Sequence, residues 1–387
     1  MHCRRWPAGA DRCFVCRDGM LLSMAIDYRT VKFRIPRTSR WNDRMQTKML
    51  WWLAALSLAG TARAAGGDAC PTRDERPPMV NFRVDNDLFG GQDQGYTNGA
   101  ELGFVSPNLS DYTDDPCLPA LARWLNRPLG FLQPKGFPQK NMVVTFAQGL
   151  FTPEDSTRRE LIRDDRPYAA LLLASMGYNG RDENRLHTTQ LQFGMLGPSA
   201  QGRQAQDLVH KITGSKKFEG WHNQLHDEPV FRLIHERMHR YAGASEGNWN
   251  WDAITHWGGT LGTISTYANA GAEIRFGKSL PDDFGSTPLR PAGENTAPTG
   301  KRGQLHGYHL FFTLDARMVA RDITLDGNTF RDSHSVDKKH FVGEAGYGVA
   351  WFSGRWKFAV ARYHRSREFD GQRERPVFGS FTITRML

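Results

Sequence analysis

One stretch of the sequence decides the fold: Tyr308-His-Leu-Phe-Phe-Thr-Leu-Asp-Ala-Arg-Met-Val-Ala-Arg321. Apolar residues take every second position from Tyr308 to Ala320, while His309, Asp315 and Arg317 lie in the opposite phase. Successive side chains of a β-strand point to opposite faces, and these seven apolar residues span roughly 40 Å at the rise of a strand. The stretch therefore predicts a long strand with one apolar and one polar face.

Eleven further segments alternate in the same way, which makes twelve strands, an even number. They are residues 80–85, 100–104, 141–151, 168–178, 184–195, 229–241, 250–261, 263–277, 339–352, 355–366 and 375–387. An even number of long alternating strands is typical of a bacterial outer-membrane barrel, in which closure leaves no unpaired edge in lipid. A secreted β-sandwich has shorter strands, and a helical membrane protein needs about 20 consecutive apolar residues. We therefore predict an all-β, transmembrane antiparallel barrel of about 12 strands.

The residues before the barrel divide into three segments. Residues 45–64 contain Lys48, a short apolar run and small residues that end at Ala62-Arg63-Ala64, the layout of a secretory signal peptide. Because such a peptide begins at the initiating methionine, translation is expected to start at Met45 or Met49, with residues 1–44 an extension of the gene model. Residues 65–78 then form a periplasmic N-terminal segment, and residues 79–387 form the barrel domain of the outer membrane.

Removal of these leading segments changes the charge and the cysteine count. The whole chain carries a net charge of +9, which by itself favours a nucleic-acid or anionic-membrane partner. Residues 1–44 hold ten Lys or Arg and four Asp, and residues 45–64 hold two basic residues, so the mature chain carries only +1. We therefore expect no nucleic-acid partner. Of five cysteines only Cys70 and Cys117 remain, and an even number in an exported chain predicts a disulfide.

Strand parity predicts which loops share a side of the membrane. If the N-terminus is periplasmic, the loop 87–95 is extracellular and residues 107–140 are periplasmic, which places Cys70 and Cys117 on the same side. The loops 152–167 and 196–228 both become extracellular. Residues 202–213 contain no proline and predict a short helix in the second of these loops.

Three polar clusters lie in or beside the extracellular loops. Asn86, Asp87 and Thr97 offer amide, carboxylate and hydroxyl oxygens, which suit Ca²⁺, although an ordinary polar hairpin tip has the same composition. Gln206 and His210 are four residues apart and share one face of the predicted helix, which is also true of many solvated helices. The third cluster, residues 164–168, is either a capped turn or a contact for anionic head groups.

Several short motifs, in order along residues 79–387, resemble the lipid A 3′-O-deacylase family of outer-membrane enzymes. They are Asn86-Asp87, Tyr96-Thr97-Asn98-Gly99, Asp165-Arg166-Pro167-Tyr168-Ala169, Gly197-Pro198-Ser199-Ala200, Gln206 with His210, Gly220-Trp221 through Gln224 with Glu228-Pro229, and Leu325-Asp-Gly-Asn328. The resemblance implies a twelve-stranded barrel whose site lies between the wall and a helix of an extracellular loop. It also implies removal of the 3′-linked acyloxyacyl chain from lipid A of lipopolysaccharide.

Carried over to this sequence, the resemblance assigns catalytic roles to His210, Gln206 and Asn86. It implies Ca²⁺ as the cofactor, held by Asp87 and Thr97 and by a glutamate for which Glu219 and Glu228 are both candidates. The polar cluster Asp165, Arg166 and Tyr168 is the expected substrate-binding region. Leu88 stands where some members of the family have an acidic residue, a departure that concerns metal coordination.

The residues also limit the mechanism. No Gly-x-Ser-x-Gly motif is present, so a serine nucleophile is unsupported and water is the expected nucleophile. A histidine can accept the proton of that water, and Ca²⁺ can polarise the ester carbonyl. The expected partners are lipid A in the outer membrane and the barrel-assembly machinery during biogenesis, with the mature protein a monomer whose site faces outside. A phospholipase, a porin-like barrel and a non-catalytic barrel remain as alternatives.

Overall fold

The computed structural model describes residue 70 and residues 77–86, 95–215, 217–243, 249–286 and 306–387. The chain divides into two units, Met1–Gly60 and Thr61–Leu387, and every described residue belongs to the second. The expected gene-model extension (1–44) and signal peptide (45–64) lie outside the described residues. Within the described part of the chain, no helix is long and apolar enough to cross a membrane.

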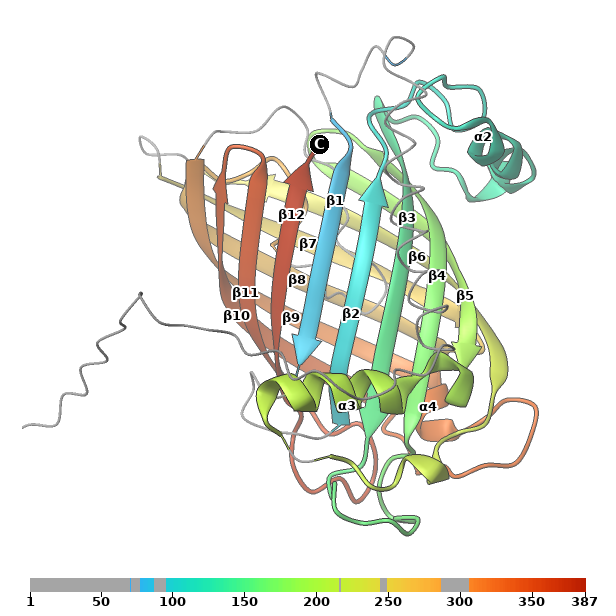
Figure 1. Cartoon of the computed structure of the whole chain (residues 1–387). Helices are drawn as coiled ribbons and strands as arrows, with labels where there is room; N and C mark the ends of the chain where they lie inside the picture. The colour runs from blue at the N-terminus through green and yellow to red at the C-terminus, as the bar shows by residue number, and fades with distance from the viewer. Residues whose placement is uncertain (1–69, 71–76, 87–94, 216, 244–248, 287–305) are drawn as a thin grey trace, which may run out of the picture. The chain divides into compact units, whose positions relative to one another are not determined.

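Twelve antiparallel strands form a closed barrel, as the sequence predicts (Figure 1). They are β1 (Met79–Asn86), β2 (Gly95–Val105), β3 (Gln139–Thr152), β4 (Ala169–Arg181), β5 (Arg185–Leu196), β6 (Glu228–Ala242), β7 (Trp249–Gly262), β8 (Ser265–Lys278), β9 (His306–Asp322), β10 (Phe341–Ser353), β11 (Trp356–Arg365) and β12 (Val377–Met386). Each strand pairs with its neighbours in sequence, and β1 pairs with β12 to close the barrel, for example Phe82 with Ile383.

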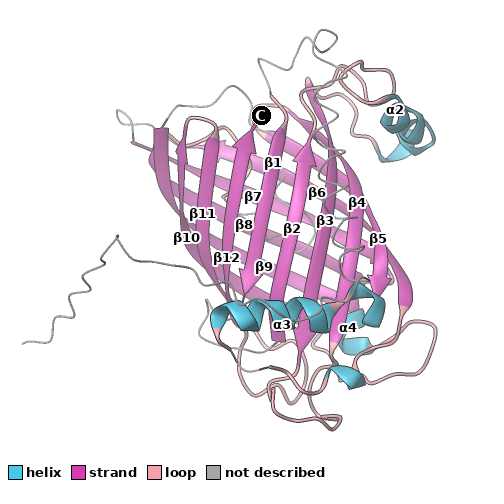
Figure 2. Ribbon diagram, viewed as in Figure 1, coloured by secondary structure: helices cyan, strands magenta, loops and turns pink. Residues whose placement is uncertain are grey.

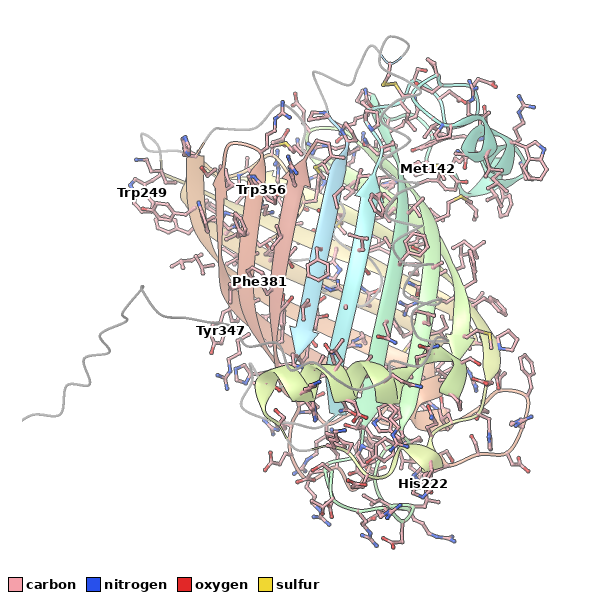
Figure 3. The ribbon with its side chains drawn as sticks, viewed as in Figure 1. Met142, His222, Trp249, Tyr347, Trp356 and Phe381 are labelled. Atoms are coloured by element: carbon pink, nitrogen blue, oxygen red, sulfur yellow. A yellow bond between two sulfur atoms is a disulfide. The ribbon has the colours of Figure 1, made fainter. Side chains whose placement is uncertain are left out.

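The alternation of β9 shows which face is outside. Leu310 is 62% exposed and Phe312 is 46% exposed, whereas His309, which precedes Leu310, is completely buried, and Phe311, which lies between the two, is buried as well. Apolar side chains are therefore on the outer surface and polar side chains in the interior, which is the arrangement that a lipid environment requires. Exposed tryptophans such as Trp249 and Trp356 lie at one end of the strands (Figure 3).

The short helices gather at the two ends of the barrel (Figure 2). Beside one end are α2 (Ala120–Asn126) and the 3-10 helix η2 (Arg127–Leu132); beside the other are η3 (Pro198–Ala200), α3 (Gly202–Thr213), η4 (Trp221–Asn223) and α4 (Ile323–Asp326). We call these the α2 end and the α3 end. Helix α3 coincides with the helix expected from the sequence. At the α2 end, Cys70 and Cys117 form a disulfide.

The interior of the barrel is filled by paired charges and by a segment of the chain. Arg275 forms two hydrogen bonds with the carboxylate of Asp252, at 2.8 and 2.6 Å. Residues 279–286, which follow β8, lie in the lumen at the α2 end, where Phe284 packs against inward-facing side chains such as Leu186 and Ile254. Asp283 of this segment pairs with Arg275 and Lys357. The lumen at this end is therefore occupied by protein.

Candidate active site

Helix α3 lies across the outer wall of the barrel rather than over its mouth. In Figure 1 the helix runs across the strands in front of β1 to β4, at the ends of these strands. Ala205 of α3 packs in a cluster with Leu150 of β3 and with Ala170 and Leu172 of β4. These three wall residues share the phase of the half-exposed Phe146, which is the lipid-facing phase. A polypeptide helix therefore covers a surface that elsewhere on the barrel faces lipid.

The wall beneath α3 carries an amide pair in the same phase as exposed apolar side chains. On β1 the outward phase runs through Val80, Phe82 and Val84 to Asn86. Phe82 is 42% exposed, but Asn86 is only 6% exposed. Asn86 pairs across the sheet with Asn98 of β2, and cross-strand partners lie on the same face. An amide pair on the lipid-facing phase is costly in hydrocarbon, so its position under α3 indicates a built polar site.

His210 and Gln206 supply the opposite side of this site. Both are 2% exposed, as expected for residues one turn apart on the inner face of a helix. Helix α3 begins over β4, because Gly202 is in close contact with Ala170. From Gly202 to His210 the helix advances by about 12 Å. Across the sheet, β4 and β1 are three strand spacings apart, which is about 14 Å. Since α3 runs across the strands, His210 is brought over β1 and β2, where Asn86 and Asn98 lie.

Two glycines allow α3 to occupy this position. A Cβ atom on Gly202 would lie 2.5 Å from Cβ of Ala170 and 2.8 Å from the ring of Trp221, so only glycine permits the close approach of the helix to the wall. At the other end, Gly214 has φ of 76° and its N–H donates to the carbonyl oxygen of His210 at 2.8 Å. This left-handed cap ends the helix one turn beyond His210.

The orientation of the Gln206 amide is fixed by Trp221. The indole Nε1 of Trp221 donates to Oε1 of Gln206 at 2.5 Å, and both side chains are buried. Because an indole N–H can only donate, the amide oxygen must face it and the NH₂ group must point the other way. Nε2 of Gln206 is buried and has no hydrogen-bond partner among the described residues. The site therefore contains a fixed donor that is available to a bound molecule.

Aromatic side chains complete the enclosure around α3. Tyr168 lies against Trp221 and Phe218, with ring centroids 5.2 and 6.2 Å apart, and Phe218 also packs on His210 at 5.7 Å. Burial raises the pKa of the Tyr168 hydroxyl to about 12, so this group stays neutral at physiological pH. Tyr168 is thus part of the aromatic enclosure around α3.

Asp165 and Arg166, also expected to contact substrate, are engaged within the protein. Asp165 accepts hydrogen bonds from the backbone N–H groups of Glu154 and Arg166, at 2.8 and 2.7 Å. Arg166 is buried, and its guanidinium donates to Glu368 at 3.2 Å and to Thr324 at 3.1 Å. Burial would raise the pKa of Glu368, but the charges of Arg365 and Arg166 outweigh this effect and lower it to about 2. These contacts make Asp165 and Arg166 scaffold residues of the loops at the α3 end.

The expected metal ligands are only partly described. Asp87 and the side chain of Thr97 lie outside the described residues. Glu219 is exposed, and Glu228 accepts hydrogen bonds from the backbone N–H groups of Thr329 and Phe330 and from the side chain of Asn328. Among the described residues, no group of three or more His, Cys, Asp or Glu side chains is arranged to hold a metal. Glu228 therefore anchors the β9–β10 connection.

Two cavities lie away from α3. One, of about 210 Å³, lies inside the barrel and is bordered by charged residues that include Arg83, Glu101 and Arg317. The other, of about 310 Å³, lies between the β3–β4 and β11–β12 connections and is bordered by both carboxylates and arginines. Neither is bordered by His210 or Gln206.

Comparison with known proteins decides the family. The family model described as outer membrane protein LpxR matches residues 50–387. The chain belongs to the LpxR family. The relationship expected from the short sequence motifs is thereby confirmed, and with it a place among outer-membrane proteins. A comparison with curated protein sequences finds no match.

Solved structures agree with the fold. LpxR from Salmonella typhimurium is similar over 80% of this chain and 100% of that one, with a TM-score of 0.64 and 16% sequence identity. The β domain of the Bordetella autotransporter BrkA is similar over 80% of this chain and 98% of that one, with a TM-score of 0.35 and 10% sequence identity.

 At this level of identity the similarity to Salmonella LpxR concerns the fold, and the BrkA match carries no further argument.

Sequence reasoning missed one polar residue of this LpxR-family site, Gln148, and gave no separate role to another, Asn98. Gln148 of β3 follows Val144 and Phe146 in the outward phase, and its Nε2 donates to the carbonyl oxygen of Ala200 at 2.6 Å, just before α3. Asn98 is the cross-strand partner of Asn86. The signal was present in the sequence, because each polar residue interrupts an apolar alternation near the same end of its strand. The contact of Trp221 with Gln206 had no such signal.

Proposed function

We propose that this chain is an outer-membrane hydrolase that removes the 3′-linked acyloxyacyl chain from lipid A of lipopolysaccharide. One observation carries the proposal: the side chains with catalytic chemistry lie between α3 and the lipid-facing phase of the wall, and not in the lumen. A substrate that reaches them from the bilayer must itself be a lipid. Membership of the LpxR family supports the same conclusion.

His210 is the proposed general base. Its imidazole takes a proton from a water molecule as the water oxygen attacks the ester carbonyl, and it returns the proton to the leaving alkoxide oxygen when the C–O bond breaks. The products are the released chain as a free carboxylic acid, which gains the water oxygen, and the lipid A hydroxyl. Water is the proposed nucleophile because the sequence has no Gly-x-Ser-x-Gly motif.

Gln206 is the proposed donor to the oxyanion. Its NH₂ group is buried and directed away from Trp221, so it is already oriented before substrate arrives. A fixed donor of this kind stabilises charge that develops on the carbonyl oxygen and needs no reorganisation during the reaction. Asn86, on the facing wall, is proposed to orient the water or the metal.

Ca²⁺ is the proposed cofactor. The amide oxygen of Asn86, the carboxylate of Asp87 and the hydroxyl of Thr97 form the oxygen-rich donor set that Ca²⁺ prefers, and these residues would hold the ion. When bound, Ca²⁺ would polarise the ester carbonyl. Neither glutamate is favoured as a further ligand. Glu228 already accepts hydrogen bonds from the β9–β10 connection, and Glu219 is exposed.

The α3 end is proposed to face outside, because lipid A occupies the outer leaflet and the site lies at that end of the strands. The N-terminal signal peptide would direct export, and the barrel-assembly machinery would insert the chain. All residues of the site come from one chain, so a monomer suffices. Arg158 and Arg163, exposed on the β3–β4 connection, are proposed to approach the phosphates of the substrate.

Removal of Ca²⁺ should lower the rate of deacylation by about 100-fold or more, because a metal that polarises a carbonyl contributes several kcal/mol to transition-state stabilisation. The measurement is fatty-acid release from lipid A in detergent micelles after treatment with EGTA. Added Ca²⁺ should restore the rate, and Mg²⁺ should not. Full activity in EGTA would contradict the metal assignment while leaving the role of His210 intact.

Replacement of Trp221 by phenylalanine should lower kcat by about fivefold with little change in KM, because one hydrogen bond that fixes the Gln206 amide is worth about 1 kcal/mol. Trp257→Phe is the matched control, since Trp257 is exposed on the outer surface. A change in KM alone would assign Trp221 to substrate binding instead of to positioning of Gln206.

The direct test of the proposed function is mass spectrometry of lipid A from cells that express the chain. Loss of the mass of the 3′-linked acyloxyacyl chain is expected. Unchanged lipid A together with hydrolysed phospholipids would identify a phospholipase instead. Conductance in planar bilayers would favour a porin, although residues 279–286 occupy the lumen at the α2 end.

A further inference from the structure

A second part of the chain, at the α2 end, also covers the lipid-facing phase of the wall. Met142 of β3 pairs across the sheet with Tyr178 of β4, in the same phase as the half-exposed Phe146. Both side chains are nevertheless buried, because Leu109, Tyr112 and Leu118 of the β2–β3 connection pack against them. Met142 is labelled in Figure 3 beside this connection. Residues 106–138, which we call the α2 segment, therefore lie on the outside of the barrel.

The α2 segment is held firmly in this position. Asn126 is completely buried; its Nδ2 donates to the carbonyl oxygen of Tyr112 at 2.6 Å, and its Oδ1 accepts from the Tyr178 hydroxyl at 2.9 Å. The Tyr112 hydroxyl donates to the carbonyl oxygen of Asn179 at 2.9 Å. The disulfide between Cys70 and Cys117 adds a covalent tie. The side of the segment that faces away from the wall is thus a fixed surface.

That outer surface is strongly apolar. Leu121 is 66% exposed, Trp124 is 63% exposed and Phe131 is 79% exposed. Large apolar side chains gathered on one side of a rigid segment are uncommon on a surface that faces water alone. Arg123 and Arg127 lie within the same stretch, and Lys135 follows it. Apolar and aromatic residues mixed with basic ones are the composition of segments that lie in a membrane interface.

The position of this surface identifies what covers it. Elsewhere around the α2 end, the outward phase presents exposed aromatic residues directly from the strands, among them Trp251, Tyr308 and Trp356. On β3 and β4 the corresponding positions are occupied by Met142 and Tyr178, which the α2 segment hides. The apolar side chains of the segment therefore continue the lipid-facing surface of the barrel across the strands where the aromatic residues are covered.

We propose that the α2 segment is an interfacial anchor, in which Leu121, Trp124 and Phe131 enter the head-group region of the leaflet at the α2 end. Arg123, Arg127 and Lys135 bind the phosphates of its phospholipids. The occupant of this surface is the lipid leaflet itself. The inference depends on the barrel spanning a membrane, and it is independent of the catalytic proposal.

Fluorescence quenching by lipids tests the anchor. A Trp124→Cys variant of the mature chain, with the native disulfide intact, is labelled with a nitrobenzoxadiazole fluorophore and placed in vesicles of phosphatidylcholine and phosphatidylglycerol. Asp114→Cys is the matched control, because Asp114 is on the same segment and highly exposed. Since interfacial segments bury their apolar face about 5–10 Å into the boundary between head groups and acyl chains, doxyl-labelled lipids should quench the probe at residue 124 about threefold more than the probe at residue 114.

Two results would overturn the proposal. Equal quenching at residues 124 and 114 would show that the segment stays in water. Protection of the residue 124 probe from both doxyl lipid and aqueous iodide would show that protein, such as a second copy of the chain, covers the surface. Both substituted residues are exposed, so the labels leave the packing around Asn126 unchanged.

Discussion

Replacement of His210 by alanine is expected to lower lipid A deacylation by about 10²- to 10⁴-fold, the usual contribution of a general base. The imidazole is buried on the inner face of α3, over the wall that carries Asn86 and Asn98, so no exposed group of the same loop can take its place. The measurement is the rate of fatty-acid release from lipid A in detergent micelles. KM should change little, because the lost interaction concerns the reacting water and not the bound lipid.

His222→Ala is the matched control. His222 belongs to the same β5–β6 connection and is exposed, and Figure 3 shows it beyond α3. Its replacement should leave the rate within about twofold of the wild type, since surface substitutions away from a site have small effects. Equal loss of activity in both variants would point to disruption of the loop, and unchanged activity in His210→Ala would refute the role of the imidazole.

Replacement of Arg166 by alanine is expected to destabilise the barrel by about 3–5 kcal/mol, the cost of breaking a buried ion pair from one side. The guanidinium donates hydrogen bonds to Thr324, in the β9–β10 connection, and to Glu368, in the β11–β12 connection. Without it, Glu368 remains buried with Arg365 as its other ion-pair partner, at 3.0 Å. The measurement is the midpoint of urea unfolding in detergent micelles, followed by tryptophan fluorescence.

Arg158→Ala provides the comparison, because Arg158 is exposed on the same connection as Arg166. It should change the free energy of unfolding by less than about 0.5 kcal/mol. The pH dependence gives a second check. The pKa of Glu368 is depressed from 4.5 to about 2, so its ion pairs stabilise the protein above pH 4.5 and lose this contribution as the pH falls towards 2. This loss should be smaller in Arg166→Ala, and equal acid sensitivity in both proteins would contradict the assignment.

Much of the fold was predictable because period-two alternation is a local property of the sequence. The outward phase of β9 can be read directly from Tyr308 to Ala320, and the structure confirms it through the exposure of Leu310 and the burial of His309. The helix over residues 202–213 was predicted from the absence of proline, and α3 has those bounds. The pairing of Gln206 with His210 on one helical face followed from their spacing alone.

Other features depend on contacts between distant segments, which no local pattern encodes. The hydrogen bond from Trp221 to Gln206 joins residues 15 apart, and the ion pair of Arg166 with Glu368 joins residues 202 apart. Arg166 appeared available to substrate because a charged residue in a loop is usually exposed, whereas its partners draw it into the protein. Entry of residues 279–286 into the lumen was likewise invisible in the sequence, since nothing local identifies Arg275 and Lys357 as partners of Asp283.

Under the proposed function, the position of α3 on the outer wall also decides how the protein would encounter its substrate. A site that opened into the lumen or into water would sample molecules in three dimensions, and its rate would depend on bulk concentration. A site beneath α3 collects molecules that diffuse in the plane of the leaflet. The quantity that governs its turnover is then the mole fraction of substrate among neighbouring lipids, so dilution with inert lipid slows the reaction even when the total amount of substrate is constant.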